Sequence, residues 1–194
     1  ALLNTKLYKV TRWLLIGLSS LIMVAAAIYV VNTYFLTIYT VDGVSMSTTY
    51  KTGDQLLINK FSKSLASANG KEYVPSRGDV VIVHAAFGTA DSLNQNFGNL
   101  DLVKRVIGLP GERVVIKDGI LTVYNKDYPN GFQPDQGASW QKNMTPDLKS
   151  ESIDIQLGPS ELFVCGDNRP ESIDSRFNGP LSTKEIVGHV IANW

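Results

Sequence analysis

The chain of 194 residues carries 18 basic residues against 18 acidic ones, so its formal net charge is zero. This balance argues against a nucleic-acid-binding protein and against recognition of an acidic substrate by bulk charge. Once a long apolar N-terminal segment is set aside, the remaining length suits one domain with a sizeable core. A single cysteine, Cys165, excludes an intrachain disulfide and a multi-cysteine metal site, and its apolar neighbours indicate a small buried hydrophobe.

Residues 13–39 form an uncharged, mostly apolar segment that follows three basic residues. About 24 helical residues at about 1.5 Å each reach roughly 36 Å, which is enough to cross a bilayer with some tilt. Aromatic residues at the two ends, Trp13 and Tyr39 among them, are typical of membrane interfaces. Because basic residues favour the cytoplasmic side, we expect residues 1–12 in the cytoplasm, a transmembrane anchor over residues 13–39, and residues 40–194 as an extracytoplasmic domain.

A cleaved signal peptide is the alternative interpretation of this segment. The basic start, the apolar residues 13–24 and the three alanines that follow meet its requirements. Apolar residues continue well past these alanines, and a signal peptide does not need that length. The sequence therefore favours a single-pass protein of the cytoplasmic membrane, with the lipid bilayer as one of its partners.

Short β-type runs separated by turns make up the rest of the chain and predict an all-β domain, mostly antiparallel. The eight runs are residues 55–60, 80–84, 102–107, 113–117, 120–124, 153–157, 162–166 and 186–193. Asp118 and Gly119 form a two-residue hairpin signal between two of these runs. Residues 62–77, 85–99 and 125–152 are polar and typical of surface loops, where substrate range or partner contacts could be built.

Ser45 lies in residues 41–50, just beyond the membrane-length segment. A serine hydroxyl is a poor nucleophile at neutral pH, so catalysis would require a neighbouring base. A serine among Gly, Ser and Thr residues is also a common turn residue, and position alone does not decide between the two. A Ser, His and Asp triad with His84 or His189 is disfavoured, because Ser45 lacks the last glycine and the strand-to-helix turn of a G-x-S-x-G elbow.

Lys104 and Arg105 form a basic pair inside an apolar β-type run. Alternation places Lys104 on one face with Leu102 and Val106, and Arg105 on the other, but it does not choose which cation faces inward. A buried lysine can lose its proton near neutral pH, whereas arginine effectively cannot. Lys104 is therefore the candidate base, and the alternative is a lysine that protects an edge strand from aggregation.

Residues 166–176 form a polar turn rich in carboxylates, hydroxyls and arginines. We expect a rigid loop in which two aspartates pair with two arginines and a serine is left to orient a neighbouring group. These residues are Asp167, Asp174, Arg169, Arg176 and Ser172. A calcium site is the alternative, but the carboxylates miss the EF-hand spacing and each has an arginine nearby, so we expect no metal and no other cofactor.

Four stretches, in this order behind one apolar segment, resemble the type I signal peptidases, which are membrane-bound Ser/Lys endopeptidases that remove signal peptides from exported proteins. The first begins at Ser45-Met46 and resembles the nucleophile segment Ser-Met-x-Pro-Thr. Residues 77–81 are similar to a structural strand of the family, and residues 104–112 to its base-bearing motif. Residues 166–176 resemble its final motif, so the likeness runs from the anchor almost to the last residue.

The resemblance implies a signal-peptidase-like β fold in which Ser45 is the nucleophile and Lys104 the general base. It further implies that Ser172 orients Lys104 and that Asp174 supports the site through Arg176. The substrate would bind as an added strand, with small residues selected at the first and third positions before the cleaved bond, as in an Ala-x-Ala site. The residues beside this strand would be Asp42, Val44, Asp101, Leu102 and Val103.

The implied acyl transfer requires a neutral Lys104. An apolar surround that includes Met46 would lower the lysine pKa from about 10.4 to near 7 or 8. Gly43 stands where some family members carry a serine that helps to form the oxyanion hole. Stabilisation of the oxyanion would then fall mainly to backbone N–H groups, with that of Ser45 as the first candidate.

The implied substrates are preproteins that carry signal peptides, cleaved at the membrane surface by a monomer near the secretion channel. Two departures from the family pattern are Thr48, in place of the usual proline, and residues 170–171, in place of the common Asp-Asn pair. A non-catalytic membrane-tethered β domain is the alternative of a different class. Within the proteases, the alternative is a relative dedicated to one pilin or conjugation protein.

Overall fold

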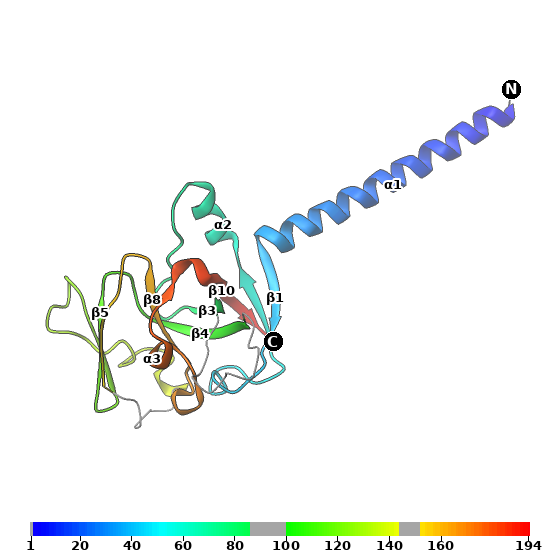
Figure 1. The fold of residues 1–194 in the computed structure, drawn as a ribbon. Helices are drawn as coiled ribbons and strands as arrows, with labels where there is room; N and C mark the ends of the chain where they lie inside the picture. The colour runs from blue at the N-terminus through cyan, green and yellow to red at the C-terminus, as the bar shows by residue number, and fades with distance from the viewer. Residues whose placement is uncertain (1, 86–99, 144–151) are drawn as a thin grey trace, which may run out of the picture.

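The structure, a computed structural model, describes residues 2–85, 100–143 and 152–194. Helix α1, Leu2–Tyr34, projects as a single rod from a β-rich domain (Figure 1). Its residues Tyr8–Tyr34 are long and apolar enough to cross a membrane, and this stretch is not buried in protein. A helix that is apolar on all sides and exposed along its length suits a lipid surround, which is consistent with the predicted anchor.

The helix ends earlier than the predicted anchor, which ran to Tyr39. The chain after Tyr34 turns into strand β1, Leu36–Thr40, so the predicted boundary is wrong for the helix. Three β-branched residues in this short stretch favour an extended backbone. Strand β1 pairs antiparallel with β2, Gln55–Asn59, and places Tyr39 opposite Leu56.

Two antiparallel sheets build the domain, which confirms the predicted all-β class. The larger sheet has seven strands in the order β1-β2-β10-β3-β4-β8-β9, and the smaller has three in the order β6-β5-β7. The other strands are β3 Val80–Ala85, β4 Leu100–Gly108, β5 Arg113–Lys117, β6 Ile120–Tyr124, β7 Ile153–Gln156, β8 Glu161–Cys165, β9 Leu181–Ser182 and β10 Ile186–Asn193. All eight predicted runs are strands, whereas β1 and β9 were not predicted.

The hairpin between β5 and β6 has the turn that its sequence predicted. Asp118 and Gly119 have φ angles of 53° and 74°. Positive φ at both central residues is what a tight type I′ turn requires. The flanking residues Lys117 and Ile120 pair directly, so the register of this hairpin is confirmed.

Residues 62–77 were predicted as a surface loop, and this is wrong for their first part. Helix α2 occupies Phe61–Ala68. The side-chain oxygen of Asn59 accepts a hydrogen bond of 2.9 Å from the Phe61 N–H, which satisfies one of the free donors at the helix start. The remaining short helices are η2 Gln141–Asn143, η3 Arg169–Glu171, α3 Ser175–Asn178 and η4 Thr183–Glu185. Of the other predicted loops, residues 86–99 and 144–151 lie outside the described residues, whereas residues 125–143 form turns, one isolated β-bridge at Phe132 and the short helix η2.

Strand β4 contributes to each of the three hydrophobic clusters of the domain. Val106 belongs to the cluster between β3, β8 and β10, and Ile107 to the cluster that joins the two sheets. Val103 packs against the third cluster, beside β1 and β2. Packing on both faces holds the backbone of β4 in place, and with it the side chains that β4 presents.

Candidate active site

Lys104 lies on β4 opposite Val81 of β3, with its side chain inside the domain. It is 2% exposed, and its Nζ donates a hydrogen bond of 2.8 Å to the hydroxyl of Ser45. A lysine that protects an edge strand from aggregation would be in solvent, so that alternative is wrong. The structure therefore brings together the two side chains that the sequence singled out as nucleophile and base.

Burial lowers the pKa of Lys104 to about 8, because a charged ammonium loses most of its hydration there. The negative charge of Asp174 opposes this shift, and the positive charge of Arg176 adds to it. A pKa near 8 leaves a substantial neutral fraction at physiological pH. A neutral amine is the form that can accept a proton from a hydroxyl.

The loop that begins at Gly166 clamps the backbone around Ser45. The Asn168 N–H donates a hydrogen bond of 3.0 Å to the carbonyl oxygen of Ser45. Met46 is buried next to it, and its Sδ accepts a hydrogen bond of 3.3 Å from the Asp167 N–H. The nucleophile segment is thus held by the loop that the sequence marked as the third polar stretch.

Gly166 allows these two segments to approach closely. A Cβ at this position would lie 2.5 Å from the carbonyl oxygen of Ser45 and 2.4 Å from Oγ of Ser172. Ser172 therefore lies beside the nucleophile segment, and its hydroxyl donates a hydrogen bond of 2.7 Å to Asp174. An orienting effect of Ser172 on Lys104 stays a prediction, because the hydrogen bond of this hydroxyl goes to Asp174.

Asp174 is a buried carboxylate surrounded by donors. It receives hydrogen bonds from the Gly166 N–H at 2.9 Å, from Ser172, and from Nε of Arg176 at 2.8 Å. Burial by itself would raise the pKa of Asp174, but Arg176 and these hydrogen bonds hold the pKa below its usual range. A fixed negative charge therefore lies close enough to Lys104 to influence its proton.

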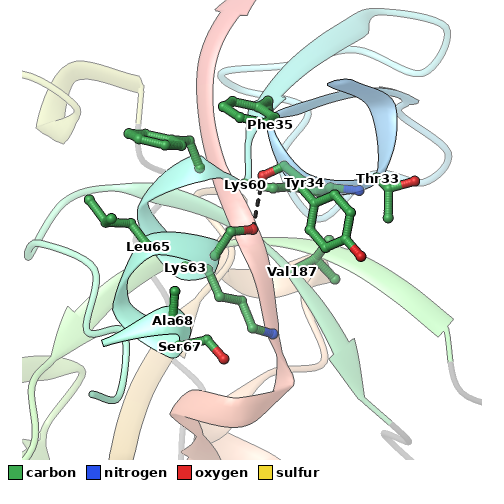
Figure 2. A pocket seen from close by; sticks show the side chains of 11 residues that line it. Thr33, Tyr34, Phe35, Lys60, Lys63, Leu65, Ser67, Ala68 and Val187 are labelled. Carbon is green, nitrogen blue, oxygen red and sulfur yellow. Dashed lines mark hydrogen bonds between the residues drawn. The ribbon is translucent and has the colours of Figure 1, made fainter. Parts of the chain in front are cut away.

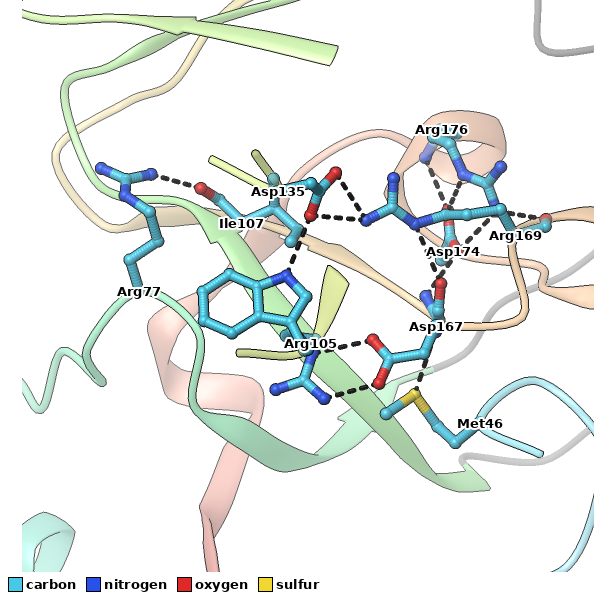
Figure 3. A network of polar contacts seen from close by, with 11 residues as sticks. Met46, Arg77, Arg105, Ile107, Asp135, Asp167, Arg169, Asp174 and Arg176 are labelled. Atoms are coloured by element: carbon cyan, nitrogen blue, oxygen red, sulfur yellow. Dashed lines mark hydrogen bonds and ion pairs between the residues drawn. The ribbon is translucent and has the colours of Figure 1, made fainter. Parts of the chain in front are cut away.

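Only one of the ion pairs expected within residues 166–176 forms as predicted, and it joins Asp174 to Arg176. Asp167 pairs instead with Arg105 of β4, and the partner of Arg169 is Asp135 (Figure 3). The expectation that Asp167 and Arg169 find their partners within this loop is therefore wrong. Asp167 and Arg169 each have a partner that is distant in sequence, because the loop folds against β4 on one side and against the β6–β7 connection on the other.

Arg105 was considered in the sequence only as the alternative to Lys104, and Asp135 and Trp140 were missed. Trp140 donates from Nε1 to Asp135 at 3.0 Å, and its ring lies 5.0 Å from the Arg105 guanidinium carbon. Arg105 also donates to the Gly78 carbonyl at 2.7 Å, and Trp140 covers Gly78 so closely that a Cβ there would lie 2.4 Å from the ring. Arg105 could have been found, since alternation places it opposite Lys104. Asp135 and Trp140 gave no signal, because they lie in a stretch that resembles an ordinary loop.

The predicted substrate-binding residues flank the Ser45 and Lys104 pair. Asp42 and Val44 are exposed, and the chain there leads directly into the nucleophile turn. On β4, strand β3 pairs with residues 100–105 and β8 with residues 105–108. Among the described residues, the first half of β4 therefore has an unpaired edge on the side of β8. Asp101, Leu102 and Val103 lie along this edge.

Both histidines have other partners. His84 lies 2.7 Å from the carboxylate of Asp101, and His189 lies 2.8 Å from the hydroxyl of Tyr73. Among the described residues, Lys104 is therefore the titratable side chain that hydrogen-bonds Ser45, and neither histidine forms a Ser, His and Asp triad with it. In the part of the chain that the structure describes, no group of three or more histidine, cysteine or acidic side chains could hold a metal ion.

Comparison with known proteins identifies the family. The sequence model of the family described as signal peptidase, peptidase S26, matches residues 11–194. The chain belongs to the signal peptidase family. Signal peptidase I V of Bacillus subtilis is 36% identical over 91% of this chain and 94% of its own length. Signal peptidase I of Bacillus caldolyticus is 34% identical over 78% of this chain and 75% of its own length. A solved signal peptidase I from Enterococcus faecalis covers 63% of this chain and 100% of its own, at 24% identity and a TM-score of 0.43.

As a member of the signal peptidase family, the chain is a serine endopeptidase. Its departure from the family pattern at Thr48 has a structural explanation. The neighbouring Ser47 and Thr49 N–H groups donate to the carbonyls of Val44 and Met46, whereas the Thr48 N–H has no acceptor among the described residues. Position 48 therefore needs no N–H donor, so the hydrogen bonds of this turn do not require threonine in place of proline.

Proposed function

We propose that this chain removes N-terminal signal peptides from exported proteins at the membrane surface, with Ser45 as nucleophile and Lys104 as general base. The observation that carries the proposal is the 2.8 Å hydrogen bond between Lys104 Nζ and Ser45 Oγ. The burial of Lys104 and its lowered pKa support the same assignment. Membership of the signal peptidase family supports the substrate class.

Catalysis begins when the neutral amine of Lys104 accepts the proton of Ser45 as its oxygen attacks the scissile carbonyl. The resulting ammonium gives this proton to the leaving amine, so the signal peptide remains as an ester on Ser45 and the mature protein is released. Water, deprotonated by the same amine, then hydrolyses the ester. One lysine thus serves as base and acid in turn, and no histidine is required.

The oxyanion is stabilised mainly by backbone donors. The Ser45 N–H has no acceptor among the described residues, so it is available to the developing charge. Gly43 has a φ of 115° and contributes no side-chain donor. The site is supported by a bonded group of three residues, Ser172, Asp174 and Arg176. The negative charge of the Asp174 carboxylate stabilises the ammonium form of Lys104.

The peptide binds as an added strand along the unpaired edge of β4. Main-chain hydrogen bonds to an edge give affinity, and pockets for alternate side chains give specificity. The strand runs between Asp42 and Val44 on one side and residues 101–103 on the other, with the scissile bond at Ser45. Small residues at the first and third positions before this bond, as in Ala-x-Ala, suit such a site.

The chain acts as a monomer in the cytoplasmic membrane, near the secretion channel. The basic residues before α1 favour a cytoplasmic N-terminus and an extracytoplasmic domain. A substrate emerging from the bilayer presents its cleavage site within reach, because residues 35–44 between the end of α1 and Ser45 span at most about 36 Å when extended. The partners are preproteins that carry signal peptides and the lipid bilayer.

The test is intact mass spectrometry of a preprotein with an Ala-x-Ala site after incubation with the purified full chain. We expect Ser45→Ala and Lys104→Ala each to reduce cleavage by about 10³-fold or more. Lys104→Arg should be equally inactive, because arginine keeps the charge but cannot act as a base.

The matched controls are Ser47→Ala and Lys142→Ala, which alter a nearby hydroxyl and an exposed ammonium and should retain cleavage. Near-normal turnover by either Ser45→Ala or Lys104→Ala would refute the dyad. A wild-type chain that binds the preprotein and leaves its mass unchanged would instead support a non-catalytic domain.

A further inference from the structure

A groove of about 840 Å³ lies where the end of α1 meets α2 (Figure 2), and neither Ser45 nor Lys104 lines it. Its walls are the last turn of α1 with Phe35, the exposed side of α2, and Val187 of β10. Most of these lining side chains are apolar or aromatic, and two lysines stand among them. Neither the proposed cleavage reaction nor the strand edge of β4 uses this groove.

Two hydrogen bonds tie α2 to the end of α1. Lys60 Nζ donates to the carbonyl oxygen of Asn32 at 2.8 Å, and the Ser64 hydroxyl donates to that of Tyr34 at 2.9 Å. Both acceptors are carbonyls of the last helical turn, which have no partner within the helix. These bonds fix the position of α2 along the axis of α1, next to the last turn of that helix. If α1 spans a bilayer, then α2 lies at the surface of that bilayer.

The exposed side of α2 is unusually apolar for a helix in water. None of its eight residues is buried, and its two largest apolar residues, Phe61 and Leu65, are 44% and 49% exposed. Phe61 stacks on Phe35, with ring centroids 5.3 Å apart, so an aromatic surface continues from α2 to the end of α1. A helix this short is marginal in water without packing on one face. Contact with acyl chains would supply that packing.

Two lysines, Lys60 and Lys63, add positive charge to the lining of the groove. Lys60 binds a carbonyl of α1, and Lys63 donates to the carbonyls of Lys184 and Ile186. An ammonium group has three donors, so each lysine that holds a carbonyl retains capacity for a further acceptor. In the described residues, no acidic side chain lines the groove. Cations and apolar side chains that line one groove at the end of a membrane helix match the phosphate and the acyl chain of a lipid.

We propose that this groove binds an anionic glycerophospholipid from the leaflet that the end of α1 reaches. One acyl chain lies against Phe61 and Leu65, and the phosphate lies near Lys60. The bound lipid holds α2 on the membrane and so limits tilting of the catalytic domain about the end of α1. This inference requires that α1 spans the membrane, but it does not depend on the Ser45 and Lys104 assignment.

Site-directed spin labelling of the full chain in phosphatidylglycerol-containing vesicles tests the membrane contact. Cys165 is fully buried and its thiol pKa is raised by burial, so a Leu65→Cys variant presents one reactive thiol. The matched control is Ile120→Cys, because Ile120 is 51% exposed at the β5–β6 turn, far from α1. We expect the label at position 65 to be relaxed by oxygen and shielded from a water-soluble nickel chelate. The label at position 120 should be open to the chelate.

Equal access of the nickel chelate to both labels in vesicles would overturn the proposal. A second measurement tests the phosphate contact through native mass spectrometry of phosphatidylglycerol retained on the full chain. Lys60→Gln should weaken retention about fivefold, in line with one cation near a lipid surface, whereas Lys117→Gln on the distant β5 should not. Unchanged retention in Lys60→Gln would refute the phosphate site. Signal-peptide cleavage in detergent should be unchanged in all four variants, which separates this proposal from that of the dyad.

Discussion

The ammonium group of Lys104 donates a hydrogen bond to the hydroxyl of Ser45, although 59 positions separate the two residues in the chain. Tertiary packing makes this contact possible, because β4 is held on both faces and the loop from Gly166 clamps the Ser45 backbone. Holding a lysine in this environment costs stability, since its charged form is poorly hydrated. That cost lowers the pKa of Lys104 and makes the lysine usable as a base.

Cleavage should depend on pH through the proton of Lys104. Because burial lowers the pKa of Lys104 to about 8, the reactive neutral form grows as the pH rises through 8 and is lost below it. We expect kcat/KM for the wild-type chain to fall about tenfold for each pH unit below 7. Initial rates on a short Ala-x-Ala peptide between pH 5 and 9 measure this limb. A flat profile would contradict lysine as the base.

Replacing Lys104 by methionine should stabilise the fold at neutral pH. The folded pKa of about 8 lies below the ordinary value of 10.5, so the unfolded chain holds more protons between these pH values. The penalty from Lys104 is therefore complete below pH 8 and disappears as the pH rises toward 10.5. Lys104→Met should gain up to about 3 kcal/mol in urea unfolding at pH 7. The gain should shrink as the pH approaches 10, and an equal gain at both pH values would contradict this origin.

A methyl group at Gly166 should disturb the site more than the fold. The Cβ of Gly166→Ala would meet the Ser45 carbonyl and the Ser172 hydroxyl, and the backbone oxygen cannot move without shifting the nucleophile. We expect kcat to fall about 10²-fold from such misplacement. Gly158→Ala is the control, because its Cβ would meet only the end of the Glu161 side chain at 3.2 Å. Equal rates in the two variants would show that the close contact at Gly166 is unimportant.

The ion pair between Asp135 and Arg169 should matter more for stability than an exposed pair. Asp135→Ala leaves the Arg169 guanidinium, whose side chain is 6% exposed, without its carboxylate. We expect a loss of about 3 to 5 kcal/mol in urea unfolding. Asp154→Ala breaks the pair with Arg113, and because these two side chains are 56% and 49% exposed and remain hydrated, the loss of stability should be much smaller. Similar losses in both would contradict the importance of burial here.

Thr48→Pro tests whether the departure from the family pattern is neutral. The Thr48 N–H has no acceptor among the described residues, and its φ is not positive, so proline removes no hydrogen bond there. Cleavage should be retained, and the thermal midpoint should stay the same or rise, because proline restricts the unfolded chain. Thr49→Pro is the contrasting variant, since it removes the 2.8 Å bond from that N–H to Met46 and the bond from its hydroxyl to Asp167. Loss of activity in Thr48→Pro alone would show that the turn requires threonine.

The sequence by itself determined the class of the fold and the chemical types at the site. Period-two runs bounded by turn residues indicated eight strands, since side chains alternate between faces and the pattern is local. The apolar N-terminal segment predicted a long exposed helix, because the length and composition of a continuous segment can also be read locally. Ser45 and Lys104 could be named because few side chains can serve as nucleophile and base, and because their surroundings resemble known motifs.

Only the tertiary structure decided which groups are partners. Asp167 has Arg169 two residues away, yet it pairs with Arg105, which is 62 positions distant. Arg169 reaches Asp135 in the β6–β7 connection, where no local pattern marks a functional residue. Pairing of buried charges is governed by which groups lose their water together, and that depends on how distant segments pack. The same packing buries Lys104, and a lysine in this sequence without that burial would have remained a protonated cation.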